Sequence, residues 1–346
     1  MAISTIDTSS ISGLGYGFKN RIINGAMVID QRNAGASVTP ANDAYTLDRW
    51  QAKQTTASKF SVQQNAGSVT PPAGFTKYLG CTSLSAFSVG ASDVFGVRQC
   101  IEGVNVADLG WGTANAQTVT VGFWVRSSLT GTFAGSLFSY TGSRSYPFTY
   151  TISAANTWEY KTITVAGDTS GTWDSGSSGG LWVFFSLGTG SSLSGTANAW
   201  AGTYTPSVTG AVSVVGTSGA TFYITGVQLE KGSTATSFDY RPYGTELALC
   251  QRYFESCFSI GTAPAAGVAA GRFRFLNMSA TLTNDVSNNL FFAVSKRAVP
   301  TMTQYASTGN TVTAAFDNFG TEGGNMFASL GANAISFSHW TASAEL

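Results

Sequence analysis

The chain has 346 residues, so two or three folding units are expected, because a typical domain holds about 100–150 residues. It contains 18 Lys and Arg against 18 Asp and Glu, and this balance excludes the basic surface that a nucleic-acid-binding protein needs. No apolar run is long enough for a membrane-spanning helix, and residues 1–10 lack the features of a secretory signal, so we expect synthesis in a cytoplasm.

The composition favours strands over helices. The chain has 40 Gly and many Ser and Thr, and these residues disfavour long helices because Gly costs backbone entropy and Ser and Thr compete for backbone hydrogen bonds. Aromatic residues make up 13% of the sequence and suit pleated sheets. No repeat of fixed period is visible, which argues against a solenoid or a propeller. We therefore expect a mainly β fold.

The first 20 residues are rich in Ser and Gly and show little apolar periodicity. This pattern predicts an extended N-terminal arm, residues 1–20, that attaches the chain to a neighbouring protein. Short strand patterns begin at residue 21. Asn24-Gly25 is a turn signal between the apolar stretches of RIINGAMVIDQR, so we expect antiparallel strand pairing to begin there.

The clearest strand pattern lies at residues 118–126, where Val119, Val121, Phe123 and Val125 alternate with residues of the opposite face. Further strand patterns occur at residues 160–165, 181–187 and 221–230. The segment LWVFFSL is apolar on both faces, which predicts a central strand, and Gly226 shifts the phase of its segment, which predicts a bulge. Many short strands separated by Gly and Ser turns indicate an antiparallel jelly-roll β-sandwich over residues 21–243.

One segment has the spacing of a helix. In GTELALCQRYFESCF, apolar residues recur three and four positions apart, namely Leu247, Cys250, Phe254, Cys257 and Phe258. This stripe predicts one connecting α-helix over residues 244–258, with Thr245 as its N-cap. Strand patterns return over residues 259–346, which predicts a small C-terminal β domain that serves assembly.

The four cysteines are Cys81, Cys100, Cys250 and Cys257. They form no CxxC pair and no dense framework, so buried free thiols are the preferred interpretation. A disulfide between Cys81 and Cys100 is the alternative, since a hairpin between them would bring the two residues together.

The stretch ITGVQLEKGSTATSFDYRPYGTELALCQRYFES resembles the segment that closes the carbohydrate-binding-like (galactose-binding-like) jelly roll of tailed-bacteriophage tail-fibre and virion structural proteins. NRIINGAMVIDQR and YTLDRW are similar to the opening elements of that family, and KRAVPTMTQY to the small β module that follows the helix. The resemblance covers residues 20–256 and extends into the C-terminal region. It implies the jelly-roll fold, a place in the virion and a homotrimer.

Two triplets within these motifs either bind a ligand or hold the fold together: Asp48-Arg49-Trp50 and Gln228-Leu229-Glu230. We favour the structural role for both. A buried Asp48–Arg49 ion pair beside a packed indole would fix the edge of the sandwich. Leu229 would fill the core, while Gln228 and Glu230 would hold neighbouring loops by hydrogen bonds.

Four tryptophans occupy turn-like surroundings: Trp111, Trp158, Trp173 and Trp200. Sugar recognition uses aromatic faces against the apolar side of a pyranose, together with a few polar groups for the hydroxyls. These four residues are therefore the candidate glycan platform. The alternative for each of them is a place at the rim of the core, because large aromatic residues dominate sandwich interiors.

The sequence offers little for catalysis. His339 is the only histidine, and a lone histidine in a strand gives no triad. Asp168 and Asp174 are the nearest approach to a pair of carboxylates, but their turn-rich segment favours Asx turns. Metal ligands and phosphate-binding loops are lacking. We therefore expect no enzyme activity, no catalytic residue, no cofactor and no bound metal.

Taken with the composition, the resemblance implies a bacteriophage tail-fibre, spike or adhesin subunit that is exposed on the virion surface. Its expected partners are two further copies of itself, other virion proteins through the arm, and carbohydrate on the host surface. A capsid decoration or head-fibre protein without sugar binding is the alternative. A polysaccharide depolymerase acting through Asp168 or Asp174 is a third hypothesis.

Overall fold

The computed structural model describes residues 19–269, 271, 273–281, 284–306 and 315–346. Most of the predicted arm therefore lies outside the described residues. Its last two residues, Lys19 and Asn20, are bound to the jelly roll, because their backbone N–H groups donate to Asp239 Oδ2 at 2.8 and 3.1 Å.

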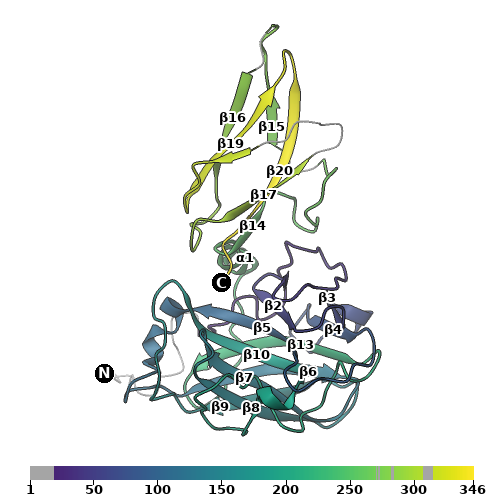
Figure 1. Cartoon of the computed structure of the whole chain (residues 1–346), viewed down its shortest axis with the longest axis vertical. Helices are drawn as coiled ribbons and strands as arrows, with labels where there is room; N and C mark the ends of the chain where they lie inside the picture. Colours follow the sequence, from purple (N-terminus) through teal and green to yellow (C-terminus); the bar gives the residue numbers. More distant parts are fainter. Residues whose placement is uncertain (1–18, 270, 272, 282–283, 307–314) are drawn as a thin grey trace, which may run out of the picture.

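The body of the chain is an antiparallel sandwich of two sheets (Figure 1). In spatial order, the first sheet contains β1 (Tyr45–Leu47), β2 (Trp50–Gln54), β5 (Val94–Glu102), β10 (Gly179–Thr189), β7 (Gly131–Ser139) and β8 (Ser145–Ile152). The second contains β3 (Phe60–Gln64), β4 (Leu79–Ser83), β13 (Thr221–Lys231), β6 (Val119–Ser127) and β9 (Glu159–Val165). The predicted mainly β jelly roll is confirmed.

Short elements complete the jelly roll. They are the parallel pair β11 (Ser194–Gly195) and β12 (Ser207–Val208) and the 3-10 helices η2 (Ala66–Ser68), η3 (Gly103–Asn105), η4 (Ala107–Leu109) and η5 (Ser191–Leu193).

Apolar side chains from the inner faces of both sheets form the core. Phe123 of β6 and Phe185 of β10 are fully buried with ring centroids 5.0 Å apart, and Val183 and Leu137 lie in the same core. The predicted strands at 118–126, 160–165, 181–187 and 221–230 are confirmed as β6, β9, β10 and β13. As expected from its two apolar faces, β10 is central and buried along nearly its whole length.

The predicted bulge at Gly226 is confirmed. The register of β13 against β6 shifts between Thr225 and Gln228, and Gly226 has a φ of 61°, a conformation that glycine tolerates. A Cβ at this position would also lie 2.6 Å from Cζ of Phe75, so both the backbone and the space favour glycine.

The prediction that strand pairing begins around Asn24-Gly25 was wrong. Asn24 does lie in a turn, with a φ of 57°, but neither flanking segment is a strand. The Asn24 side chain supplies hydrogen bonds that strand pairing would otherwise give to the backbone here. Its Nδ2 donates to the carbonyls of Ile29 (2.8 Å) and Asp48 (3.0 Å), and its Oδ1 accepts from the N–H of Ile29.

The helix is shorter than predicted. α1 spans Tyr243–Gln251, its N-cap is Pro242, and Thr245 does not cap it. The helix cannot reach residue 258, because Phe254–Ser256 form β14, which pairs with residues 341–343 near the end of the described chain. This partner is far away in the sequence, so local spacing does not reveal it.

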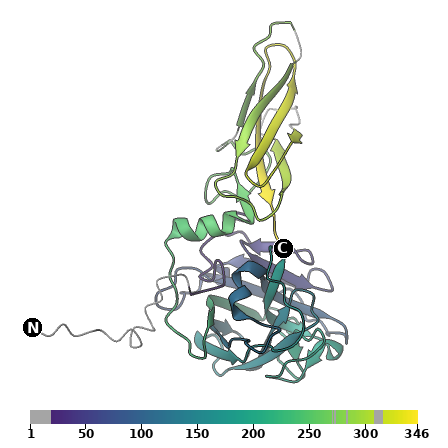
Figure 2. The ribbon, with the colours of Figure 1, turned by 90° about the vertical axis from the view of Figure 1, so that its left-hand side faces the viewer.

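A second, smaller β domain stands on the jelly roll beyond α1 (Figures 1 and 2). One of its sheets contains β14, β15 (Phe273–Leu276), β17 (Thr301–Ala306) and β20 (Ile335–Ser343). The other contains β16 (Asn284–Phe291), β18 (Ala315–Asp317) and β19 (Gly323–Leu330). Phe275, Leu290, Met326 and Trp340 are buried between the two sheets.

All four cysteines are free, and Cys81 and Cys100 lie in different sheets, on β4 and β5. The disulfide alternative was therefore wrong. Burial raises the pKa of both thiols, to about 12 for Cys100. No helix in the described part of the chain combines the length and the apolar character that a membrane span requires.

Buried ion pairs join the two domains. Glu345, just after β20, accepts from Arg32 at 2.7 Å and from Arg49, whose side chain is almost fully buried in the jelly roll. Arg252, just after α1, donates to both carboxylate oxygens of the fully buried Glu102, at 3.0 and 2.8 Å. A buried charge is very costly without its partner, so each pair fixes the position of the elements that bear it.

We expect Glu345→Gln to destabilise the protein strongly, because it leaves the Arg49 guanidinium buried without a carboxylate. The free energy of unfolding, measured by urea denaturation, should fall by about 3–5 kcal/mol. Asp108→Asn is the control. It breaks pairs with Arg21 and Lys231 in which all side chains are partly exposed, and it should cost less than about 1 kcal/mol. Equal small losses in both variants would contradict the role of Glu345.

Candidate functional site

The Asp48-Arg49-Trp50 triplet lies at the junction of the two domains. The Trp50 indole is fully buried and donates to the carbonyl of Asn24 at 3.1 Å. The predicted Asp48–Arg49 ion pair is not formed. The Arg49 guanidinium lies 3.5 Å from the centroid of the Tyr253 ring and pairs with Glu345, while Asp48 accepts from the backbone and the side-chain amide of Gln31, both at 2.7 Å.

Burial of Asp48 has a consequence for stability. Loss of solvation raises the pKa of this carboxyl to about 6, although Arg32 and the hydrogen bonds from Gln31 act in the opposite direction. The folded state therefore binds this proton more tightly than the unfolded chain, in which the pKa is 3.8. The contribution of Asp48 to stability is complete below the unfolded pKa and is lost as the pH rises through 6.

We expect Asp48→Asn to remove this dependence on pH. In the unchanged protein, Asp48 should lower the free energy of unfolding by about 2 kcal/mol between pH 4 and pH 7, because one pKa unit corresponds to about 1.4 kcal/mol and part of the effect is already lost at pH 4. Urea denaturation at several pH values measures the slope. Asp174→Asn, at an exposed position, is the control, and in this variant the slope of the unfolding free energy against pH should be unchanged. A slope that is unchanged in Asp48→Asn would contradict the assignment.

The Gln228-Leu229-Glu230 triplet makes internal contacts. Leu229 is fully buried, and the Gln228 amide accepts from the N–H of Asp239 at 2.8 Å and donates to Glu230 at 2.9 Å. Glu230 in turn accepts from the backbone and the hydroxyl of Thr236, at 2.8 and 2.6 Å. Both polar side chains thus hold the loop that leads from β13 to α1.

Three of the four predicted tryptophans come together, and Trp158 lies apart. The ring centroids of Trp111, Trp173 and Trp200 are 4.7–5.6 Å from one another, and every pair meets edge to face. Each indole N–H donates to a backbone carbonyl, and the adjacent cavity measures only about 40 Å³. Trp158 instead packs edge to face on Tyr78 at 5.5 Å. Because the three rings meet edge to face, they present no common flat platform. The role of the four tryptophans in glycan binding stays a prediction.

The two candidate carboxylates form Asx turns. Asp168 Oδ1 accepts from the N–H of Ser170, and Asp174 Oδ1 accepts from the N–H of Gly176 at 2.7 Å. Asp168 is also buried in a bidentate pair with Arg144, at 2.6 and 2.7 Å. His339 is buried against Phe258, with ring centroids 4.4 Å apart. The part of the chain that the structure describes contains no cluster of His, Cys, Asp and Glu that could hold a metal ion.

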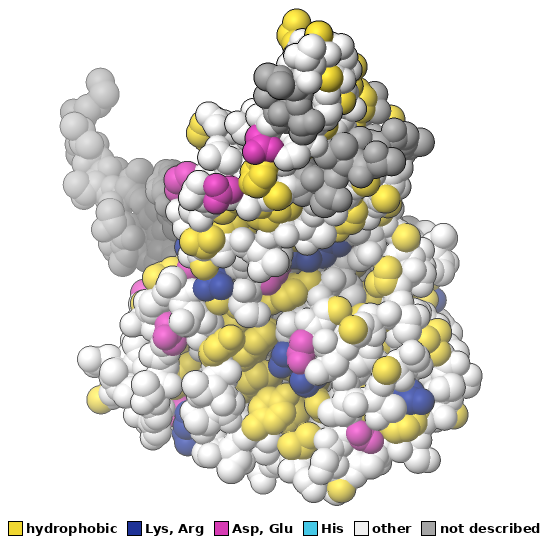
Figure 3. All heavy atoms as spheres, turned by 45° about the horizontal axis from the view of Figure 1, so that its top comes forward, with side chains coloured by type: hydrophobic (Ala, Val, Ile, Leu, Met, Phe, Trp, Pro, Cys, Tyr) yellow, Lys and Arg dark blue, Asp and Glu magenta, His cyan; other side chains and the backbone are white. Residues whose placement is uncertain are grey.

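The outer face of the six-stranded sheet contains an open groove of about 400 Å³. Register explains how its side chains come together. Gln51 of β2 pairs with Arg98 of β5, and Trp182 of β10 pairs with Phe138 of β7. The loops and the chain end complete the lining with Tyr140, Thr141, Gly142, Tyr204 and Leu346. Hydrophobic side chains also gather on the face of the jelly roll below the C-terminal domain (Figure 3).

Aromatic rings form the floor of this groove. The Tyr140 ring, 44% exposed, lies nearly parallel to the buried Trp182 indole, with an angle of 8° and centroids 5.9 Å apart. The Arg98 guanidinium lies 4.1 Å from the centroid of the same indole. Trp182 is therefore held rigidly, and it supports Tyr140 as an exposed flat ring.

Polar groups lie beside the aromatic floor. Arg98 donates to the Gln51 side chain at 2.7 Å and to Asp43 at 2.6 Å, so these three side chains form a fixed network. The Tyr204 hydroxyl is buried without a hydrogen-bond partner among the described residues. None of the described residues that line the groove is Asp or Glu. The arrangement can stack on a sugar ring and bond its hydroxyls, and it offers no pair of carboxylates for hydrolysis.

The groove does not follow from local sequence patterns. Residues 181–187 form the strand buried on both faces that their apolar run predicts, and this run conceals the aromatic outer face. Trp182 and Phe184 alternate with Val183 and Phe185 of the core, and that alternation, with Tyr140 directly after β7, was the available signal.

No protein-family model matches the sequence, and no curated protein matches it. Solved structures resemble the jelly roll at low identity. They include a putative sugar binding protein from Bacteroides thetaiotaomicron VPI-5482 (TM-score 0.37, 11% identity, 62% of this chain and 100% of that chain) and the enzymatically active domain of bacteriophage CBA120 tailspike protein 4 (TM-score 0.33, 13% identity, 62% of this chain and 21% of that chain). A family 11 carbohydrate-binding module from Clostridium thermocellum, in complex with a mixed-linked tetrasaccharide, has a TM-score of 0.30 at 11% identity over 56% of this chain and 96% of that chain.

This chain thus spans about one fifth of the tailspike chain that it resembles. At these identities and TM-scores the likeness says nothing about ligand or activity. The fold and the groove define a two-domain β protein with a jelly roll whose outer sheet face presents exposed aromatic and polar side chains.

Proposed function

We propose that this chain is a virion surface subunit of a tailed bacteriophage, a tail fibre, spike or adhesin, that binds neutral glycan in the groove of the six-stranded sheet. The observation that supports binding most directly is the exposed Tyr140 ring stacked on the rigid Trp182 indole beside Arg98 and Gln51. A flat ring next to fixed donors matches a pyranose, which has an apolar face and a rim of hydroxyls.

The virion role is supported by the resemblance of residues 20–256 to phage virion proteins. The composition agrees with it, because a chain with 10% charged residues and 40 Gly suits a rigid β assembly better than an electrostatically steered binder. We propose binding without catalysis, because no Asp or Glu is among the described residues that line the groove.

One observation favours the alternative of a virion protein without sugar binding. Leu346 lines the groove and packs with Trp182 and Phe184, so the chain covers part of this face itself. A capsid decoration or head-fibre protein would use the same aromatic face for packing alone.

We expect Tyr140→Ala to weaken glycan binding at least tenfold, because it removes the only half-exposed ring of the described groove. Isothermal titration with neutral oligosaccharides selected on a glycan array measures the effect. Tyr160→Ala is the matched control, since Tyr160 is 42% exposed but lies on β9 of the other sheet. Equal affinity of both variants, or silence of the unchanged protein on the array, would favour the alternative without sugar binding.

We further propose that the C-terminal domain and α1 hold three chains together. Large exposed apolar side chains are frequent beyond residue 259 in the described part of the chain: Ile260, Met278, Phe291, Val299 and Ile335. Exposed apolar side chains of this kind mark surfaces that become buried between chains.

Size-exclusion chromatography with light scattering should give a mass of about three protomers. Phe291→Ser should shift the protein toward the monomer, because this side chain is 77% exposed at the end of β16. Tyr160→Ser, on the jelly roll, should keep the trimer. A stable monomer at micromolar concentration would contradict the proposed assembly.

A further inference from the structure

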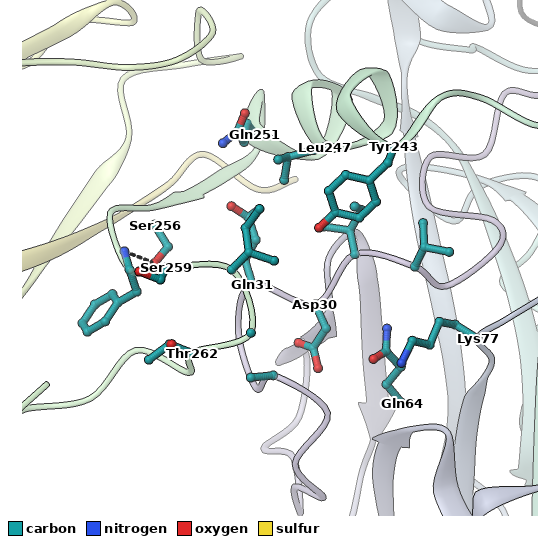
Figure 4. A pocket seen from close by; sticks show the side chains of 16 residues that line it. Asp30, Gln31, Gln64, Lys77, Tyr243, Leu247, Gln251, Ser256, Ser259 and Thr262 are labelled. Atoms are coloured by element: carbon teal, nitrogen blue, oxygen red, sulfur yellow. Dashed lines mark hydrogen bonds between the residues drawn. The ribbon is translucent and has the colours of Figure 1, made fainter. Parts of the chain in front are cut away.

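A second pocket, of about 360 Å³, lies between the two domains (Figure 4). One wall comes from the jelly roll, with Asp30, Gln64 and Lys77. Helix α1 contributes Tyr243, Leu247 and Gln251, and the third side is formed by Ser256 at the end of β14 and by residues 258–262. The size falls within the range of about 300–1,000 Å³ that is usual for small-molecule sites.

Several polar groups of this pocket are not used by the fold. The side chains of Lys77, Tyr243 and Gln251 have no hydrogen bond or ion pair within the described residues. Tyr243 is 46% exposed, and Figure 4 shows its ring reaching from α1 toward Gln31 and Asp30. A ligand can therefore be bound without breaking internal contacts of these three side chains.

The remaining polar groups are held in place. Asp30 accepts from the N–H groups of Asn33 and Gly35 at 2.8 and 2.7 Å, and the Gln64 amide donates to the carbonyl of Met27 at 2.7 Å. Each carboxylate oxygen retains a further lone pair. The jelly-roll wall thus presents both fixed acceptors and the unpaired ammonium of Lys77 to the pocket.

The charge of the pocket selects among ligands. The charged side chains that line it are Asp30 and Lys77, so their sum is zero. None of the ion pairs among the described residues joins these two side chains. A phosphate or a uronate would meet the Asp30 carboxylate, whereas a neutral hydroxyl group can donate to Asp30 and accept from Lys77.

We infer that this pocket is a second saccharide site, which binds one neutral sugar unit through stacking on Tyr243 and through hydroxyl contacts with Asp30 and Lys77. It is separate from the groove, because the two share no lining residue. The ligand would touch the jelly roll, α1 and the residues after β14 at once. Its binding would therefore also hold the C-terminal domain in its position on the jelly roll.

The test uses the full chain with the Tyr140→Ala substitution, which disables the groove, so failure of the groove and failure of this pocket are distinguishable. The probes are the methyl glycosides of glucose, galactose and mannose, with glucuronate and inorganic phosphate for comparison. Saturation-transfer NMR measures binding. We expect at least one neutral glycoside to bind. Adding either Tyr243→Ala or Lys77→Met to this chain should weaken the affinity for that glycoside at least tenfold.

Tyr160→Ala and Lys59→Met are the matched controls, because both residues lie outside the pocket, and they should leave the affinity unchanged. Circular dichroism verifies that each variant is folded. Three results would overturn the inference: no neutral glycoside binds, the pocket variants bind as well as the controls, or phosphate or glucuronate binds more tightly than every neutral glycoside.

Discussion

The position of the C-terminal domain depends on the carboxylate of Glu345. This group lies between Arg32 and Arg49, and Arg49 is held at the same time against the Tyr253 ring and the carbonyl of Cys100. The chain has few charges, and it buries several of them at this junction. Since a buried ion pair is stable only in one geometry, the pairs define the angle at which the second domain meets the first more sharply than apolar contacts would.

This constraint extends to both candidate binding sites. Leu346 follows Glu345 directly and lines the groove, while the Tyr45 hydroxyl donates to its carbonyl at 2.9 Å. On the side of the interdomain pocket, the Gln31 amide bridges Asp48 and the carbonyl of Phe254, just before residues 256–262. The C-terminal domain therefore shapes one wall of each site, although the jelly roll supplies most of the polar groups.

The sequence predicted what depends on local pattern. The two-residue period identified β6 and β9, the run that is apolar on both faces identified β10, and the phase shift at Gly226 identified the bulge. Local patterns gave wrong predictions where the pairing partner of a residue lies far away in the sequence. The residues after Gln251 have helical spacing but pair with β20, and Arg49 has an adjacent carboxylate in Asp48 but pairs with Glu345. Nor could it reveal the groove, because Tyr140, Trp182 and Arg98 meet only through the strand order β5-β10-β7.

The same strand order explains why an aromatic outer face is tolerated here. An exposed apolar sheet would invite aggregation, but Arg98 and Tyr140 both pack on the Trp182 indole and cover it. Arg98 and Tyr140 can both contact a ligand. The side chains that shield the Trp182 indole from water are therefore the side chains that we propose bind sugar. A ligand that stacks on Tyr140 extends this cover without requiring the sheet to rearrange, and little of the binding energy would be lost to ordering the site.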